Sequence, residues 1–157
     1  MIFYIFFTFL LLAATFCAIQ ISIADFRRRI IPDAYLFPLM LIGLILITFF
    51  PAFPTQLSDA VIGATFGYTL TAIIGIIFEH RLRTHGDSTT IPIGMGDIKL
   101  ISIGGLWLGT SGLSIALIIA CATGAIWAYK NKQRHIPFAP FFLTGGFLSF
   151  IATMFLL

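Results

Sequence analysis

The sequence has 157 residues, of which 59% are hydrophobic and only 10% are charged, and its mean hydropathy is +1.06. This composition excludes an ordinary soluble domain and is typical of a polytopic membrane protein. The length allows a single all-α domain over residues 1–157, a membrane helix bundle of five or six spans at roughly 20 residues each. A net charge of +3 would suggest a nucleic-acid partner in a soluble protein, but here we attribute it to basic loops and expect no nucleic acid.

The first predicted span covers about residues 2–24. We expect it to be retained rather than removed as a signal peptide, because it is longer than a signal-peptide core and no basic segment precedes it. A short polar loop, Asp25-Phe26-Arg27-Arg28-Arg29, follows. The second span is predicted over residues 34–50, with Pro32 and Asp33 close to its amino-terminal cap.

Two prolines, Pro51 and Pro54, end the second span because proline cannot continue a helical hydrogen-bond ladder. Ser58 and Asp59 are candidate caps for the third span, which reaches about Phe78. The remaining predicted elements are a polar connection at 79–93, a fourth span from Asp97, a turn at 109–112, a fifth span to about Tyr129, a basic loop at 130–135 and a last span at 137–157. Gly145 and Gly146, inside that last span, predict close helix packing.

Charge favours six spans over five. With six spans, all the Lys and Arg residues fall on one side of the membrane, which the positive-inside rule assigns to the cytoplasm, and both termini lie outside. Asp25 and Asp97 then lie at the same membrane depth, 72 positions apart (97 − 25) along the chain. The nine basic residues are Arg27, Arg28, Arg29, Arg81, Arg83, Lys99, Lys130, Lys132 and Arg134.

Two carboxyl groups at one membrane face predict acid–base chemistry, because an ionisable group inside a membrane segment is costly and is usually functional. Two carboxyls that share one proton have different pKa values. The ionised member can take a proton from water while the protonated member polarises a carbonyl group. Gly94 and Gly96, just before Asp97, would let a substrate backbone come near.

Each residue also has a purely structural interpretation. Asp25 could pair with Arg27, Arg28 or Arg29, and Asp97 could be only a helix cap. Lys99 could extend to the membrane interface or tune Asp97, which makes it a candidate site-shaping residue. We interpret Asp33 as a helix cap and Asp87 as a loop residue. His80, His85 and His135 lack the spacing of a metal-binding pair, and Cys17 and Cys121 form no CxxC pair, so no metal or cofactor is predicted.

Three segments together resemble the type IV prepilin peptidases, the membrane aspartic proteases named for a GxGD motif. The first is Asp25 followed by Arg29-Ile30-Ile31-Pro32-Asp33. The second is Gly94-Met95-Gly96-Asp97-Ile98-Lys99-Leu100. The third is Ile136-Pro137-Phe138-Ala139-Pro140-Phe141, in which Ala139 replaces the usual glycine. GxGD alone is a weak signal, but three motifs in order over nearly the whole chain are specific.

The resemblance implies that Asp25 and Asp97 are catalytic and that Gly94 and Gly96 shape the site. It implies removal of short basic leader peptides from type IV prepilins or pseudopilins, at the cytoplasmic face of a bacterial inner membrane. The cut follows a glycine. Membrane lipid and pilus or secretion assembly components are the expected further partners. Many members carry paired CxxC motifs linked to methylation of the new amino terminus. Because these motifs are missing here, the expectation is a short form without methyltransferase activity.

Three rival interpretations remain. A proton-coupled transporter or channel component would have ionisable groups in mid-span. The ionisable residues of this sequence instead cluster at one membrane interface. A presenilin-type protease shares GxGD but usually places its first aspartate inside a span of a larger chain. A non-catalytic member of a secretion complex could keep both aspartates.

Overall fold

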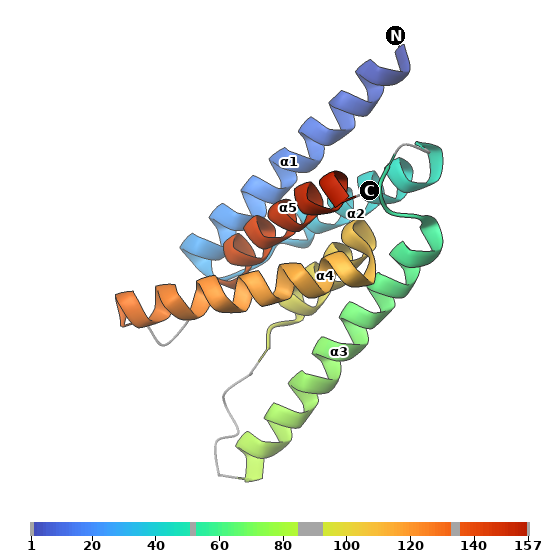
Figure 1. Cartoon of the computed structure of the whole chain (residues 1–157). Coiled ribbons are helices and arrows are strands. Elements are labelled where there is room, and N and C mark those ends of the chain that lie inside the picture. The colour runs from blue at the N-terminus through green and yellow to red at the C-terminus, as the bar shows by residue number, and fades with distance from the viewer. Residues whose placement is uncertain (1, 51–52, 85–92, 133–135, 157) are drawn as a thin grey trace.

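The computed structural model of the chain describes residues 2–50, 53–84, 93–132 and 136–156, and this part of the chain is helical (Figure 1). The all-α prediction is therefore confirmed. Three of the helices, α1, α3 and α4, are long and apolar enough to cross a membrane. The helices are α1 (Ile2–Arg28), α2 (Asp33–Phe49), α3 (Leu57–Thr84), α4 (Met95–Asn131) and α5 (Phe138–Leu156).

Helix α1 is longer than the sequence predicted and includes Asp25. The loop predicted at residues 25–29 is wrong for residues 25–28, which continue the helix. Arg29 ends it in a left-handed conformation (φ 54°), and its N–H donates to the Asp25 carbonyl at 2.9 Å. Asp25 thus has a fixed direction on the last turn of a helix. The second predicted span agrees with α2 to within one residue, and Pro32 is its N-cap.

Helix α3 also extends past its predicted end, to Thr84, so residues 79–84 do not belong to the polar connection. Arg83 donates to Glu79 one turn earlier at 2.5 Å, a spacing that supports a helix. The predictions for Pro51, His85, Asp87, Arg134 and His135 fall outside the described residues.

Helix α4 folds back on itself at Gly109, which has φ 67° and ψ −174° within an otherwise helical segment. Asp97 and Gly124 line one pocket. In a straight helix, 27 residues would separate them by about 40 Å. In Figure 1 the yellow start and the orange end of α4 both lie to the left of the bend. The predicted turn at 109–112 therefore corresponds to a bend, although the described chain has five helices rather than six.

The bend of α4 is held by α3. Asp59, in the first turn of α3, accepts hydrogen bonds from the Thr110 hydroxyl at 2.6 Å and, more weakly, from the Thr110 N–H at 3.4 Å. Asp59 was predicted to cap its own helix, but its side chain instead caps the second half of α4. A Cβ on Gly109 would collide with the same carboxylate.

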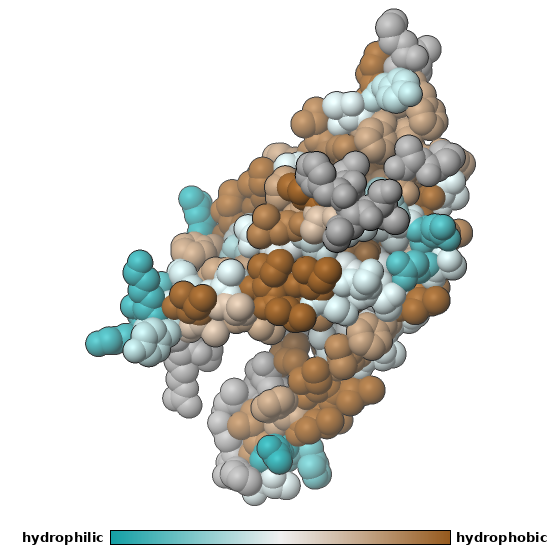
Figure 2. Space-filling view, in the orientation of Figure 1, coloured by the Kyte–Doolittle hydropathy of each residue, from teal (hydrophilic) through white to brown (hydrophobic). Residues whose placement is uncertain are grey.

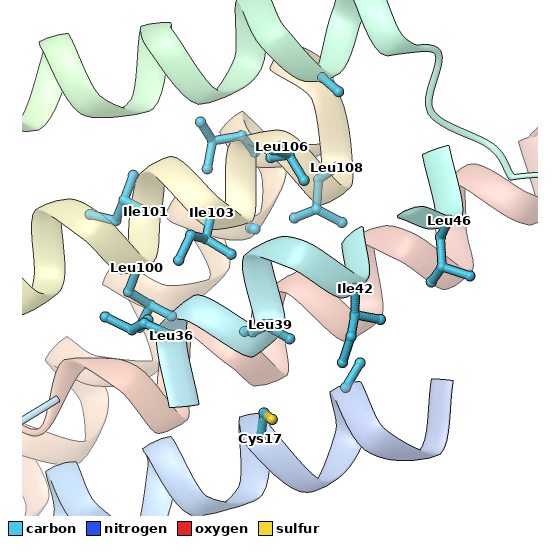
Figure 3. Close-up of a cluster of buried hydrophobic side chains, with 14 of the residues drawn as sticks. Cys17, Leu36, Leu39, Ile42, Leu46, Leu100, Ile101, Ile103, Leu106 and Leu108 are labelled. Carbon is cyan, nitrogen blue, oxygen red and sulfur yellow. The ribbon is translucent and has the colours of Figure 1, made fainter. Parts of the chain in front are cut away.

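Helix α2 lies between α1 and the first half of α4. Figure 3 shows Leu36 and Leu39 of α2 facing Leu100 and Ile103 of α4, with Cys17 of α1 on the other side. Leu36 and Leu100 are almost completely buried. This core fixes the first half of α4, which carries Asp97, relative to α1, which carries Asp25.

Small residues bring α3, α4 and α5 into backbone contact. A Cβ on Gly63 of α3 would collide with the Gly105 carbonyl of α4. A Cβ on Gly145 of α5 would lie 2.7 Å from the Ala116 carbonyl, which confirms the predicted close packing at Gly145. Such contacts let membrane helices gain van der Waals energy where lipid is as apolar as their side chains.

The outside of the molecule is largely apolar. Figure 2 shows hydrophobic colours over most of the body and hydrophilic residues gathered toward its margins. Large exposed side chains include Ile76, Ile118, Ile126 and Phe147. Exposed apolar surface on this scale is expected of a protein whose surroundings are lipid.

Candidate active site

Asp25 is buried, with 6% of its surface exposed, although it lies near the charged end of α1. Its Oδ2 atom accepts a hydrogen bond from the backbone N–H of Ala139 at 2.7 Å. Ala139 is the second residue of α5, where backbone N–H groups have no partner inside the helix. The amino terminus of α5 therefore holds the Asp25 carboxylate, in a position that also favours negative charge.

Asp97 lies in the first turn of α4, two residues after the helix begins at Met95. Gly94 is the N-cap, and its carbonyl accepts from the Asp97 N–H at 3.1 Å. The Asp97 side chain is half-buried and lies close enough to Asp25 for the two carboxyl groups to interact through their charges. The fold thus brings together two aspartates that are 72 positions apart (97 − 25).

The charges around Asp25 do not form a simple ion pair. Within the described chain, Asp25 makes no ion pair with Arg27, Arg28 or Arg29, and only Arg29 acts on it, at longer range. Helix α5 contributes no acidic or basic residue in its first turn or its last. Among the described residues, the charged groups that interact with Asp25 are therefore Arg29 and Asp97.

The two glycines of the GxGD segment differ in their surroundings. A Cβ on Gly96 would lie 2.8 Å from the Ile31 Cβ, so Gly96 allows α4 to approach the segment between α1 and α2. Gly94 is exposed, and a Cβ there would lie 3.1 Å from Asp97 Oδ2. Gly96 therefore has a packing role, and Gly94 leaves one side of the Asp97 carboxyl open.

Lys99 binds Asp33 rather than either predicted catalytic residue. Its Nζ atom lies 2.8 and 2.7 Å from the two carboxylate oxygens of Asp33, and both side chains are nearly half exposed. The bond joins the first turn of α2 to the start of α4. Asp33 makes no capping hydrogen bond, since the cap position is Pro32. Lys99 is thus a link between two helices beside the site.

A pocket of about 410 Å³ opens beside Asp97. Its walls are formed by both halves of α4 and the start of α5. Ile93, before α4, and Ile136, before α5, complete them. The lining residues are Ile93, Asp97, Ile101, Ala120, Cys121, Gly124, Ala125, Ile136, Phe138 and Phe141. Phe138 directly precedes Ala139, the donor to Asp25, so the pocket that Asp97 lines also reaches the part of α5 that holds the second carboxylate.

The sequence did not predict the contribution of Ala139. The third motif was recognised, but only as a resemblance, and Ala139 was noted as a departure from the usual glycine. Ala139 acts through its backbone N–H, which every residue except proline has. The residue type at position 139 therefore could not predict this hydrogen bond. The proline-flanked start of a helix was the available clue.

Two interacting carboxyl groups, one held by a helix amino terminus and the other on the wall of an apolar pocket, can divide the roles of base and acid toward a bound amide. This arrangement can activate water and polarise a carbonyl group without a metal ion.

Comparison with known proteins places the chain in a family. Residues 4–129 match the type IV leader peptidase family. This match covers most of the chain, and the chain belongs to that family.

The curated relatives include proteins named prepilin leader peptidase/N-methyltransferase. The protein from Aeromonas salmonicida strain A449 is 28% identical over 147 residues, which cover 89% of this chain and 48% of the relative. The Pseudomonas aeruginosa protein is 28% identical, over 90% of this chain and 48% of the relative. The Burkholderia pseudomallei protein is 32% identical, over 82% of this chain and 41% of the relative. The chain thus spans about half the length of these relatives. No solved structure gives a significant match.

Proposed function

We propose that the chain is an aspartic-type endopeptidase that removes the short basic leader peptide from type IV prepilins or pseudopilins. The observation that carries the proposal is the meeting of Asp25 and Asp97 beside an apolar pocket. The family and the names of the curated relatives support a leader peptide as the substrate.

In the proposed reaction the two carboxyl groups share one proton and hold a water molecule between them and the substrate. The ionised carboxylate removes a proton from the water as it attacks the scissile carbonyl carbon. The protonated carboxyl donates a hydrogen bond to the carbonyl oxygen, where negative charge develops. Proton transfer to the leaving nitrogen then breaks the C–N bond and releases the leader with a new carboxylate.

We assign the ionised role to Asp25 and the protonated role to Asp97 at the start of the reaction. A hydrogen bond from a backbone N–H to a carboxylate favours its charged form, and Asp25 accepts one from Ala139 at the end of a helix. Asp97 lies on an apolar wall and beside the negative charge of Asp25. Both surroundings disfavour a second negative charge, so the shared proton is assigned to Asp97.

The protein is proposed to lie in a bacterial inner membrane with six crossings, the two halves of α4 counted separately. Arg28, Arg83 and Lys130 lie at or near the ends of α1, α3 and α4. In Figure 1 these ends lie toward the left and lower left, opposite the amino terminus. The basic ends and both aspartates would face the cytoplasm, where a basic leader precedes the membrane-inserted helix of its prepilin.

The proposal is tested by cleavage of a prepilin with a Lys/Arg leader and a Gly-Phe junction, in liposomes. Wild type is compared with Asp25→Asn and Asp97→Asn, each checked for folding by its thermal unfolding curve. We expect wild type to release the leader and each variant to lose at least 10³-fold in rate, on the order of losses seen for catalytic groups. Near-normal turnover by a variant would exclude the paired mechanism, and a folded wild type without activity would favour a non-catalytic or proton-coupled membrane component.

A further inference from the structure

Among the residues that the structure describes, the lining of the pocket beside Asp97 has one charged group, Asp97 itself. The rest of the wall consists of aliphatic and aromatic side chains, one cysteine and one glycine. Burying an unpaired charged side chain against such a wall is strongly unfavourable. The described part of the wall therefore favours an apolar occupant that contacts Asp97.

The shape of the pocket comes from small residues. Ala120, Gly124 and Ala125 lie on the second half of α4, where larger side chains would fill the space toward Ile136 and Phe141. A Cβ on Gly124 would still lie at ordinary contact distances, 3.5 Å from Ile136 and 3.7 Å from Phe141. Gly124 can thus be enlarged without a collision with backbone, which makes it a suitable position to test the pocket.

The size of the pocket separates the possible occupants. About 410 Å³ lies at the small end of ligand pockets. This volume suits one large side chain and is small for a helix, whose diameter with side chains is about 10 Å. The helix of a substrate would have to lie outside, with one of its terminal side chains inserted.

We propose that this pocket binds the apolar side chain that flanks the bond to be cut, and that Gly124 and Cys121 help to set the size of side chain accepted. The inference rests on the proposed peptidase function and identifies a specificity subsite for it. Insertion of the side chain beside Asp97 would place the adjacent peptide bond next to the Asp97 carboxyl group, which interacts with Asp25. Positioning of this kind lowers the barrier to reaction.

The first test varies the substrate and the pocket together. Prepilin peptides with Phe, Leu or Ala next to the cleaved bond are compared for kcat/KM in liposomes. Wild type should prefer Phe over Ala by about 10- to 100-fold, the range expected of a hydrophobic pocket. Gly124→Leu should reduce or reverse this preference. The matched control, Ile126→Leu, changes an exposed side chain on the same helix and should leave it unaltered. An equal loss for all peptides with Gly124→Leu, or no loss, would overturn the proposal.

The second test does not depend on turnover. Cys121 is exposed and lines the pocket, whereas Cys17, the other cysteine, is buried. In a Cys17→Ala, Asp97→Asn background, a Phe peptide should slow alkylation of Cys121 at least fivefold, and a Ser peptide should not. A cysteine placed at Ile126, with Cys121→Ser, should be alkylated at the same rate with either peptide.

The two tests separate this proposal from the proposed function. Protection of Cys121 without cleavage by wild type would support the pocket and contradict the peptidase assignment. Cleavage without size discrimination and without protection would overturn the pocket and leave the peptidase assignment in place. Alkylation that falls on addition of phospholipid, with no further effect of the Phe peptide, would identify lipid as the occupant and overturn the proposal.

Discussion

At the scale of single residues, the account depends on how Asp25 is held. Its carboxylate is buried, yet its one hydrogen-bond donor in the described chain is the backbone N–H of Ala139. Hydrogen bonds to charged groups contribute about 1.5–3 kcal/mol, which corresponds to roughly 10- to 150-fold in an equilibrium or a rate. Under the proposed mechanism, this single backbone group on α5 helps to determine which member of the pair is ionised.

Substitutions at Ala139 can remove this backbone donor while a second variant controls for the size of the new side chain. Ala139→Pro deletes the N–H in a helical turn that tolerates proline, whereas Ala139→Val adds similar bulk and keeps the donor. We expect Ala139→Pro to lower kcat by about 10- to 100-fold beyond Ala139→Val. The acidic limb of its pH–rate profile should move to higher pH, because ionisation of Asp25 has lost a favourable interaction.

Ala139→Gly, which keeps the N–H, should retain the wild-type profile. The measurement is the pH dependence of kcat for leader release. If the proline and valine variants have the same profile, the hydrogen bond has no part in ionising the pair.

Sequence reasoning selected Asp25 and Asp97 as candidate catalytic residues because carboxylates in an apolar chain are conspicuous, and their catalytic role remains a prediction. It placed Lys99 at the site, and whether Lys99 acts there remains a prediction. The structure pairs Lys99 with Asp33, 66 positions away (99 − 33). The sequence near Lys99 does not indicate which carboxylate it binds. A lysine can pair with any of several aspartates that the fold brings close, and their separation along the chain does not distinguish them.

At the scale of elements, the bend in α4 sets the geometry. Gly109 has a conformation that other residues adopt only with strain, and the Asp59 carboxylate occupies the place of its missing side chain. The bend turns the second half of α4 back beside the first and so creates the pocket. The glycine-containing turn at 109–112 was predictable from sequence, whereas the cap from Asp59 was not, because it comes from another helix.

Substitution at this bend should be costly. Gly109→Ala combines backbone strain of about 1–3 kcal/mol with a collision against Asp59. We expect a loss of several kcal/mol in the free energy of unfolding, measured by denaturation in mixed detergent micelles, together with loss of activity.

The matched control is Gly75→Ala in α3, where an added Cβ would meet nothing closer than 3.8 Å. Replacing glycine by alanine inside a helix is stabilising by about 0.5–1 kcal/mol where space permits. Equal effects of the two substitutions would show that the bend does not require Gly109.

The helix boundaries show where sequence patterns lose precision. The predicted end of the first span was drawn at the first charged residue, but α1 continues through Arg28 and α3 through Thr84. A change from apolar to charged residues marks where a helix leaves an apolar environment. It does not mark where the helical hydrogen bonds stop, and these continue for one or two turns.

At the scale of the whole molecule, topology decides whether the site can reach a leader peptide. If the halves of α4 are separate crossings, Ser111 at the bend lies on the same side as Gln56, and Lys130 lies on the other. We expect cysteines at positions 56 and 111, in a chain without Cys17 and Cys121, to be labelled from the periplasmic side. A cysteine at 130 should be labelled only from the cytoplasmic side. Labelling of position 111 from neither side would indicate a bend buried within the membrane.

The central claim is that Asp25 and Asp97 act as one catalytic unit, and its most direct test is a double-mutant comparison of leader cleavage. Residues that act as a unit have non-additive effects on kcat. The account predicts that Asp25→Asn, Asp97→Asn and the double variant lose activity to nearly the same residual rate in liposomes. Independent losses that multiply in the double variant, or one single variant that retains turnover, would contradict it.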